Sequence, residues 1–410
     1  MFCCFFSQAN SISLSRLNAI IGSSNSTLMS NYLITGKYLK SPLITDIPRF
    51  DQRNLQLNKF NFFKLPQPVI SAKTNMNLVV SKSSFVNSMS PIRLNSLDRS
   101  KYKPFTQRKE RKNAILTLRD VLFDFCSSVS EDGGSLYCAD CQVTITDVEF
   151  VSSTGQMGGG FFARNSKISM TGTSFFKCIA KTEAGGFMAK ECENVQMSRC
   201  YIVANSAESK HGGFLITHAV IKLTENYIHE NTAVRSYGGA SFDHVTGEIN
   251  QCKFVDNKSD NDNGGTAFYT METAGLLFLE YCTFGGDTTN FILAASTAGI
   301  TISECCFSRP KKESIIIEQG PTGSTEETTP RLYNNYFNGM CGPAPKLPPR
   351  FYKEIFHHPE TAPVIEWWKL YSGLAIFILI LGIMAFTIPS VFFPLAVRGA
   401  HRKGDSKNTK

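Results

Sequence analysis

Short stretches of alternating apolar and polar residues recur along the chain, and each ends five residues before an apolar marker. Alternation with a period of two predicts short β-strands with one buried face. The markers predicted to stack in one buried column are Phe150, Phe176, Ile202, Ile228, Phe254, Phe284 and Phe307. The first five are 26 residues apart and the last two follow after 30 and 23, so the later repeats carry small insertions and deletions. In one repeat the alternating residues Ile168 and Met170 fit Phe175 better than Phe176.

Glycine pairs follow the same period. They are Gly133-Gly134, Gly159-Gly160, Gly185-Gly186, Gly212-Gly213, Gly238-Gly239 and Gly264-Gly265. A unit of 26 residues is too short for a domain, but it suits one coil of three strands that buries its inward face by stacking on its neighbours. Glycine at a corner permits positive φ or a very close approach of successive coils. We therefore predict an all-β chain folded as a right-handed parallel β-helix.

The C-terminal part predicts a membrane anchor. Residues 370–397 contain no charged side chain and exceed the ~20 apolar residues that a transmembrane helix needs. The predicted segments are an N-terminal segment 1–53 with a short signal peptide or irregular early coils, β-helix repeats 54–340 with an exposed basic loop 93–113, a juxtamembrane linker 341–369, one transmembrane helix 370–397 and a basic tail 398–410.

The charges beside the predicted span indicate its orientation. The tail carries Arg398, Arg402, Lys403, Lys407 and Lys410 against Asp405 alone. By the positive-inside rule the tail is cytosolic and the β-helix faces outward, at the plasma membrane or alternatively at an endomembrane. This topology needs a signal sequence, and residues 1–11 match one poorly because they lack a basic region. Without a signal the chain would be a tail-anchored cytosolic scaffold.

The net charge of +8 arises in the N-terminal quarter, since residues 1–113 hold 17 Lys and Arg against 4 Asp and Glu. No stretch interleaves aromatic with basic residues as a nucleic-acid groove does. We therefore expect no nucleic-acid partner.

Polar residues also recur with the period. Asn205, Asn231 and Asn257 are 26 residues apart, which predicts a ladder of side-chain hydrogen bonds along one column. Asn25 and Asn257 begin glycosylation sequons, although an inward Asn257 could not carry a glycan.

Three cysteines, Cys252, Cys282 and Cys305, precede successive markers by two residues and should stack on consecutive coils. Stacking brings the sulfur atoms close without ensuring the torsions of a disulfide. A buried thiol ladder and a disulfide therefore both stay open, with the thiol ladder favoured.

Candidate chemistry comes from two further columns. Glu191, His218 and His244 each lie five residues after a glycine pair, which outlines a metal site against the simpler interpretation of solvent-facing side chains. Glu230 and Asp256 occupy equivalent positions on neighbouring coils, and a carboxylate pair in a groove would indicate a carbohydrate-active enzyme. No cofactor or catalytic residue is otherwise indicated.

The repeats resemble those of a known family. A Gly-Gly-apolar element such as Gly238-Gly239-Ala240 is followed by Phe254-Val255-Asp256-Asn257, with variants at 202–205 and 228–231. This pattern, over residues 114–340, resembles the chlamydial polymorphic membrane proteins and the Pmp-like β-helix surface proteins of protist parasites. With a helical anchor predicted at its C-terminus, the chain is more similar to the protist type. The resemblance implies passenger β-helices that act in adhesion.

These observations predict a membrane-anchored surface protein that adheres or presents a ligand without catalysis. Its expected partners are the lipid bilayer, through residues 370–397, and a protein or glycan on another surface. The first alternative is a membrane-tethered carbohydrate-active enzyme or carbohydrate-binding module, and the second is the tail-anchored cytosolic scaffold.

Overall fold

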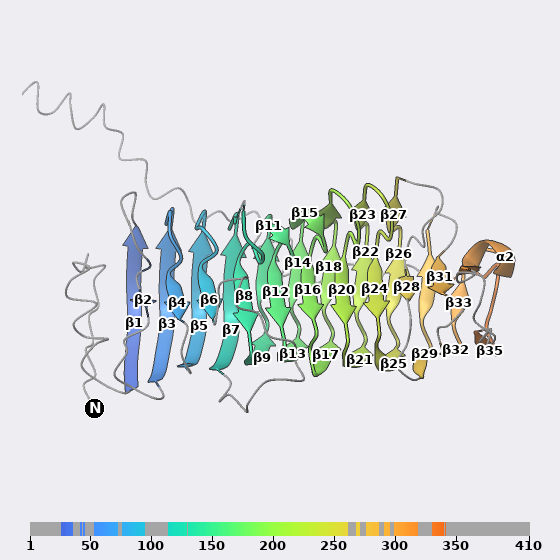
Figure 1. Cartoon of the computed structure of the whole chain (residues 1–410), viewed down its shortest axis with the longest axis horizontal. Coiled ribbons are helices and arrows are strands. Elements are labelled where there is room, and N and C mark those ends of the chain that lie inside the picture. The colour runs from blue at the N-terminus through green and yellow to red at the C-terminus, as the bar shows by residue number, and fades with distance from the viewer. Residues whose placement is uncertain are drawn as a thin grey trace, which may run out of the picture. The chain divides into compact units, whose positions relative to one another are not determined.

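The computed structural model describes residues 26–35, 42, 44–45, 53–72, 76–94, 114–128, 130–260, 268–270, 276–286, 291–295, 299–318, 330–339 and 341. All of them belong to one compact unit, Met1–Ala344. Their strands form three sheets, here called A, B and C, in which every pairing between described strands is parallel. Successive coils lie side by side along one axis from β1 to β35 (Figure 1). The predicted all-β parallel β-solenoid of the right-handed type is therefore confirmed.

The described strands divide among the sheets as follows. Sheet A contains β1 (Ser26–Thr35), β3 (Arg53–Phe63), β5 (Met76–Val86), β7 (Ala114–Asp124), β9 (Cys141–Thr146), β10 (Glu149–Val151), β13 (Lys167–Thr171), β14 (Ser174–Phe176), β17 (Asn194–Ser198), β18 (Tyr201–Val203), β21 (Val220–Thr224), β22 (Tyr227–His229), β25 (Thr246–Asn250), β26 (Lys253–Val255), β29 (Leu277–Glu280), β30 (Thr283–Gly285), β32 (Ile300–Ser303), β33 (Cys306–Phe307) and β35 (Arg331–Tyr333). Sheet B contains β2 (Ile44–Thr45), β4 (Ile70–Ala72), β6 (Ile92–Leu94), β8 (Leu136–Ala139), β12 (Phe161–Arg164), β16 (Phe187–Lys190), β20 (Phe214–Thr217), β24 (Ala240–Asp243), β28 (Phe268–Thr270), β31 (Ile292–Ala295) and β34 (Ile315–Glu318). Sheet C contains β11 (Thr154–Met157), β15 (Ile179–Glu183), β19 (Ser206–Ala207), β23 (Thr232–Ala233) and β27 (Lys258–Ser259). The helix α2 (Lys311–Ser314) precedes β34.

The solenoid begins earlier than residue 54. β1 pairs in parallel with β3, which pairs with β5, so the predicted N-terminal segment 1–53 supplies at least one regular strand of sheet A. Arg93, placed by the sequence in the basic loop 93–113, instead lies in β6 with 6% of its surface exposed. Residues 95–113 lie outside the described part of the chain.

The marker residues stack in one interior column. In the first described coils Phe62, Phe85, Phe123 and Phe150 have ring centroids 4.8 to 5.0 Å apart. The column continues through Phe175, Ile202, Ile228, Phe254, Phe284 and Phe307. Each buried side chain of this size contributes roughly 1.5 to 3 kcal/mol before the entropy of ordering it is counted.

Phe176, which the sequence placed in this column, is a correction. Phe175 pairs with Phe150 and Ile202 and is fully buried. Phe176 is half-buried, and the Lys177 ammonium lies 5.1 Å from its ring centroid. The reason is the period of two: this coil is one residue shorter than the 26-residue spacing, so the neighbouring side chain points inward.

The coils turn at residues with left-handed backbone conformation, and most of these are not glycine. Arg199 and Glu225 are one such pair, with φ of 52° and 55°. The next residue points inward and bonds to the adjacent coil, as the Cys200 N–H donates to Asn226 Oδ1 at 2.9 Å. A left-handed conformation costs roughly 1 to 2 kcal/mol for a residue with a Cβ, and these repeated bonds help to offset it.

The glycine pairs serve the close approach of coils rather than positive φ. Gly159, Gly185 and Gly212 lie in one column, and none of them has positive φ. A Cβ built on Gly185 would overlap the carbonyl oxygen of Gly212 in the next coil. Only glycine therefore fits at these positions.

The predicted asparagine ladder is present. Asn205 Nδ2 donates to Asn231 Oδ1, and Asn231 Nδ2 donates to Asn257 Oδ1, both at 2.9 Å. The three side chains are at most 1% exposed. Asn257 is therefore inaccessible for glycosylation in the folded chain, whereas Asn25 lies outside the described residues.

In the described part of the chain, no helix has the length and apolar character that a bilayer crossing requires. The predicted transmembrane helix 370–397 and the tail 398–410 lie outside the described residues, as does the linker 341–369 except for Cys341.

Candidate functional site

The corner that follows sheet B carries a column of polar residues. Asp140, Asn165, Glu191, His218 and His244 each come directly after a sheet B strand or its last coil position and have φ between 47° and 53°. None of them is fully buried. The parallel register of sheet B places them on successive coils, which is the column that the sequence predicted for Glu191, His218 and His244.

Glu191 does not join the two histidines in a metal-binding group. Its carboxylate accepts hydrogen bonds from the guanidinium of Arg164, and the closest N–O distance in this ion pair is 3.2 Å. Arg164 ends β12 on the preceding coil, so the carboxylate has a cationic partner on the side away from His218. The predicted role of Glu191 as a third ligand is therefore wrong.

The two histidines do lie together. The imidazole rings of His218 and His244 stack with centroids 4.5 Å apart and an angle of 4° between their planes. Asp243, which ends β24, places Oδ1 2.6 Å from Nδ1 of His244. One potential ligand atom from each of the three residues lies within 4.8 Å of the others. Sequence reasoning missed Asp243, although it directly precedes His244 in the chain.

A second feature is a shallow hollow of about 170 Å³ on the outer face of sheet A, across β9, β13 and β17. Its lining residues are Gln142, Val143, Thr144, Lys167, Ile168, Ser169, Asn194 and Gln196. Val143 and Ile168 point into the core, so the outward groups are amides, hydroxyls and one ammonium group. The Lys167 ammonium also pairs with Glu193 at 2.9 Å. Such groups can donate to and accept from a ligand rich in hydroxyl groups.

The carboxylates Glu230 and Asp256 lie at a different corner and are not part of this hollow. His229 lies between them, with Nε2 2.7 Å from the Glu230 carboxylate and Nδ1 4.0 Å from that of Asp256. The pair is thus bridged by an imidazole and does not form a two-carboxylate cleft.

The cysteines of the solenoid interior are buried thiols. Cys252, Cys282 and Cys305 are free and stack in one column, as the thiol-ladder interpretation predicts. Burial raises the pKa of Cys178 and of Cys200 to about 12. Because the thiolate is the reactive form, these side chains are structural rather than nucleophilic.

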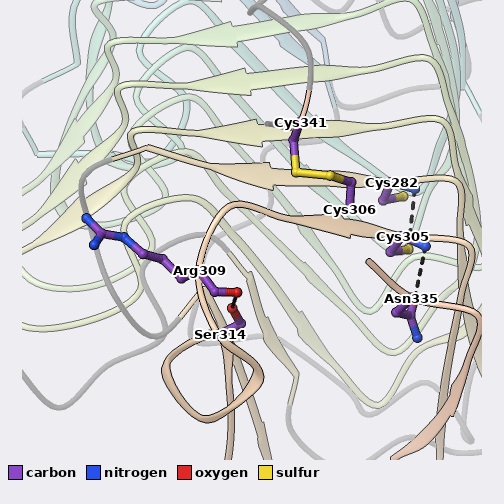
Figure 2. The surroundings of a disulfide bond; sticks show 7 residues. All are labelled: Cys282, Cys305, Cys306, Arg309, Ser314, Asn335 and Cys341. Carbon is purple, nitrogen blue, oxygen red and sulfur yellow. Dashed lines mark hydrogen bonds between the residues drawn. A yellow bond between two sulfur atoms is a disulfide. The ribbon is translucent and has the colours of Figure 1, made fainter. Parts of the chain in front are cut away.

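The sequence did not predict the disulfide between Cys306 and Cys341. Figure 2 shows it beside the inward column of Cys282, Cys305 and Asn335. Cys306 follows Cys305 directly and is half-buried, because neighbouring residues of a strand point to opposite faces. Its partner lies 35 residues farther along the chain.

The outer face of sheet B is covered by a second, smaller core. Phe162, Met188 and Leu215 point outward from their strands and pack with Ala184. His211 continues this cover. Its ring is 7% exposed, stacks on Tyr237 and places Nδ1 2.7 Å from Ser241 Oγ.

His211 should make the stability of the solenoid depend on pH. Burial, assisted by the charge of Lys210, lowers the pKa of His211 to about 3, against an ordinary value of 6.5. Above pH 6.5 the ring is neutral in both states, so its packing contributes fully. As the pH falls below 6.5 only the unfolded chain takes up the proton, and the free energy of unfolding should fall by about 1.4 kcal/mol per pH unit until about pH 3.

Urea unfolding at pH 7.5 and 5.0 tests this expectation. The loss of stability between the two pH values should be about 2 kcal/mol smaller in His211→Gln than in the wild-type chain, because glutamine keeps a polar group near Ser241 without titrating. Equal losses in both proteins would show that His211 does not carry this dependence.

No protein-family model matches the chain, and no curated protein matches it either. The fold is therefore established by the structure, and the resemblance to Pmp-like repeats rests on the glycine-pair and FxxN pattern.

Proposed function

We propose that the chain is a single-pass membrane protein whose β-helix stands outside the cytoplasm and binds a glycan or protein on another surface without catalysis. The observation that carries this proposal is the outer face of sheet A. The interior columns are filled by stacked apolar and hydrogen-bonded side chains, so ligands are left the outside of the solenoid. On that outside, the hollow across β9, β13 and β17 offers amide and hydroxyl groups.

The topology has two supports. The uncharged residues 370–397 followed by a basic tail favour a helical anchor with a cytosolic C-terminus. The disulfide between Cys306 and Cys341 favours an oxidising compartment for the β-helix, since disulfides rarely persist in the cytosol. The disulfide therefore argues against the tail-anchored cytosolic scaffold, and the Pmp-like resemblance favours adhesion at the plasma membrane.

The absence of catalysis has its own support among the described residues. The lining of the hollow contains no carboxylate, and the Glu230 carboxylate is held by His229. A glycoside hydrolase needs two carboxylates that flank the scissile bond. A ligand in the hollow would therefore be held rather than cleaved.

Protease treatment of intact cells that express the chain with a tag at each end tests the topology. The proposal predicts that the N-terminal tag is lost while the C-terminal tag is protected. Two protected tags would remove the basis for an adhesin.

A binding assay on glycan arrays and on intact target cells tests the hollow. Lys167→Ala and Asn194→Ala should weaken binding, because both residues line the hollow. Lys222→Ala is the matched control, since Lys222 lies on the same outer face and pairs with Glu248 as Lys167 pairs with Glu193. Equal effects of all three changes would contradict a ligand in the hollow.

A further inference from the structure

Two histidines and an aspartate converge at one corner because of the strand register. Thr217 at the end of β20 pairs with Asp243 at the end of β24, so the residues that follow, His218 and His244, occupy the same position on adjacent coils. Both have left-handed φ, and their rings stack in parallel. The backbone therefore holds the two imidazoles one coil apart.

This spacing suits a transition-metal ion. Zinc binds imidazole nitrogen at about 2.0 to 2.1 Å, so two nitrogen ligands of one tetrahedral ion lie roughly 3.3 Å apart. The ring centroids are 4.5 Å apart, and side-chain rotation of these partly exposed residues can bring their nitrogens together. The carboxylate of Asp243, now 2.6 Å from His244 Nδ1, is placed to supply an oxygen ligand.

We propose that His218, His244 and Asp243 form a surface site for a divalent transition-metal ion, with zinc as the representative ion. Two imidazoles and one carboxylate favour such an ion over calcium or magnesium, which prefer oxygen ligands. Three protein ligands leave a further coordination position for water or for a donor group from another molecule. Metal binding at this corner does not depend on the proposed adhesion.

Isothermal titration of the purified full-length chain in detergent with zinc chloride tests the site. His218→Ala and His244→Ala should each weaken zinc binding by about ten-fold or more, because each removes a ligand. Asp243→Asn should also weaken it. His229→Ala is the matched control and should leave the affinity unchanged, since His229 is also a partly exposed histidine beside carboxylates.

The chain also contains His357, His358 and His401 outside the described residues, so a second readout must report on the solenoid. Zinc should raise the melting temperature of the β-sheet signal in the wild-type chain but not in the His218→Ala, His244→Ala double variant, because an ion bound to the folded site stabilises it. The variants should melt like the wild type in the presence of a chelator.

Three results would overturn the site. These are an unchanged zinc affinity in the double variant, an equal loss in His229→Ala, and a zinc-dependent melting temperature that persists in the double variant. An unchanged affinity in Asp243→Asn would remove the aspartate from the ligand set and overturn the site as proposed.

Discussion

Replacing Phe254 by aspartate is expected to destabilise the solenoid by more than about 5 kcal/mol and to split it locally. Phe254 is fully buried, and its ring stacks on that of Phe284 with centroids 4.9 Å apart. Loss of a buried phenyl group alone costs about 3 to 5 kcal/mol, and a carboxylate in the apolar interior adds a further cost. Because each coil contacts only its neighbours, the damage should concentrate around β22, β26 and β30.

Hydrogen exchange measured by mass spectrometry can locate this damage. Amides of β26 and β30 should lose protection in Phe254→Asp, while those of β3 to β9 keep it. Phe278→Asp is the matched control, because Phe278 points outward from β29 and is 37% exposed. Similar losses in both variants would contradict the inward and outward assignment of these side chains.

Gly185→Ala should destabilise the chain by about 3 kcal/mol or more, although it adds a single methyl group. The new Cβ would overlap the backbone oxygen of Gly212, and a backbone atom cannot rotate away as a side chain can. The two coils would have to separate. This would lengthen the hydrogen bonds from Gly185 N–H to His211 O, now 3.1 Å, and from Gly186 N–H to Gly213 O, now 2.7 Å.

The control for this prediction is Gly285→Ala. The nearest atom to a Cβ on Gly285, outside its chain neighbours, is Ser308 Oγ at 3.9 Å, and its φ is not positive. Urea unfolding should therefore show a large loss for Gly185→Ala and little change for Gly285→Ala. A Gly185→Ala variant as stable as the wild type would mean that the coils are not packed as closely as described.

The periodic features of the fold could be predicted from the sequence because each coil repeats the same environment. Alternation located the strands, and the 26-residue spacing aligned Asn205, Asn231 and Asn257. A strict spacing failed at Phe176, where one coil is shorter and the period of two exchanges inward and outward residues. The alternating residues Ile168 and Met170 carried the correct register.

Features that depend on contacts between unlike positions could not be predicted in this way. Glu191 repeats the position of His218, but its partner Arg164 occupies another position of the preceding coil. The disulfide joins Cys306 to Cys341, which lies outside the repeated pattern. Left-handed corners such as Glu225 carry side chains of many kinds, because the backbone bond to the next coil, rather than the residue type, holds them.

The central claim is that the repeats form tiers of one parallel stack. One register column on the outer face of sheet A runs through Thr144, Ser169, Gln196, Lys222, Glu248, Phe278 and Thr301. Parallel strands lie about 4.8 Å apart, so position 144 should be about 19 Å from position 248 and about 29 Å from position 301.

Pulsed electron spin resonance between spin labels on introduced cysteines measures these distances directly. The pairs are Thr144→Cys with Glu248→Cys, Ser169→Cys with Thr301→Cys, and Thr144→Cys with Thr301→Cys, in a chain whose Cys3 and Cys4 are serine. The free cysteines of the described part are buried and should not compete for the label. The account predicts distances that grow linearly, by about 4.8 Å for each of four, five and six tiers. Distances that do not increase with the number of tiers would contradict it.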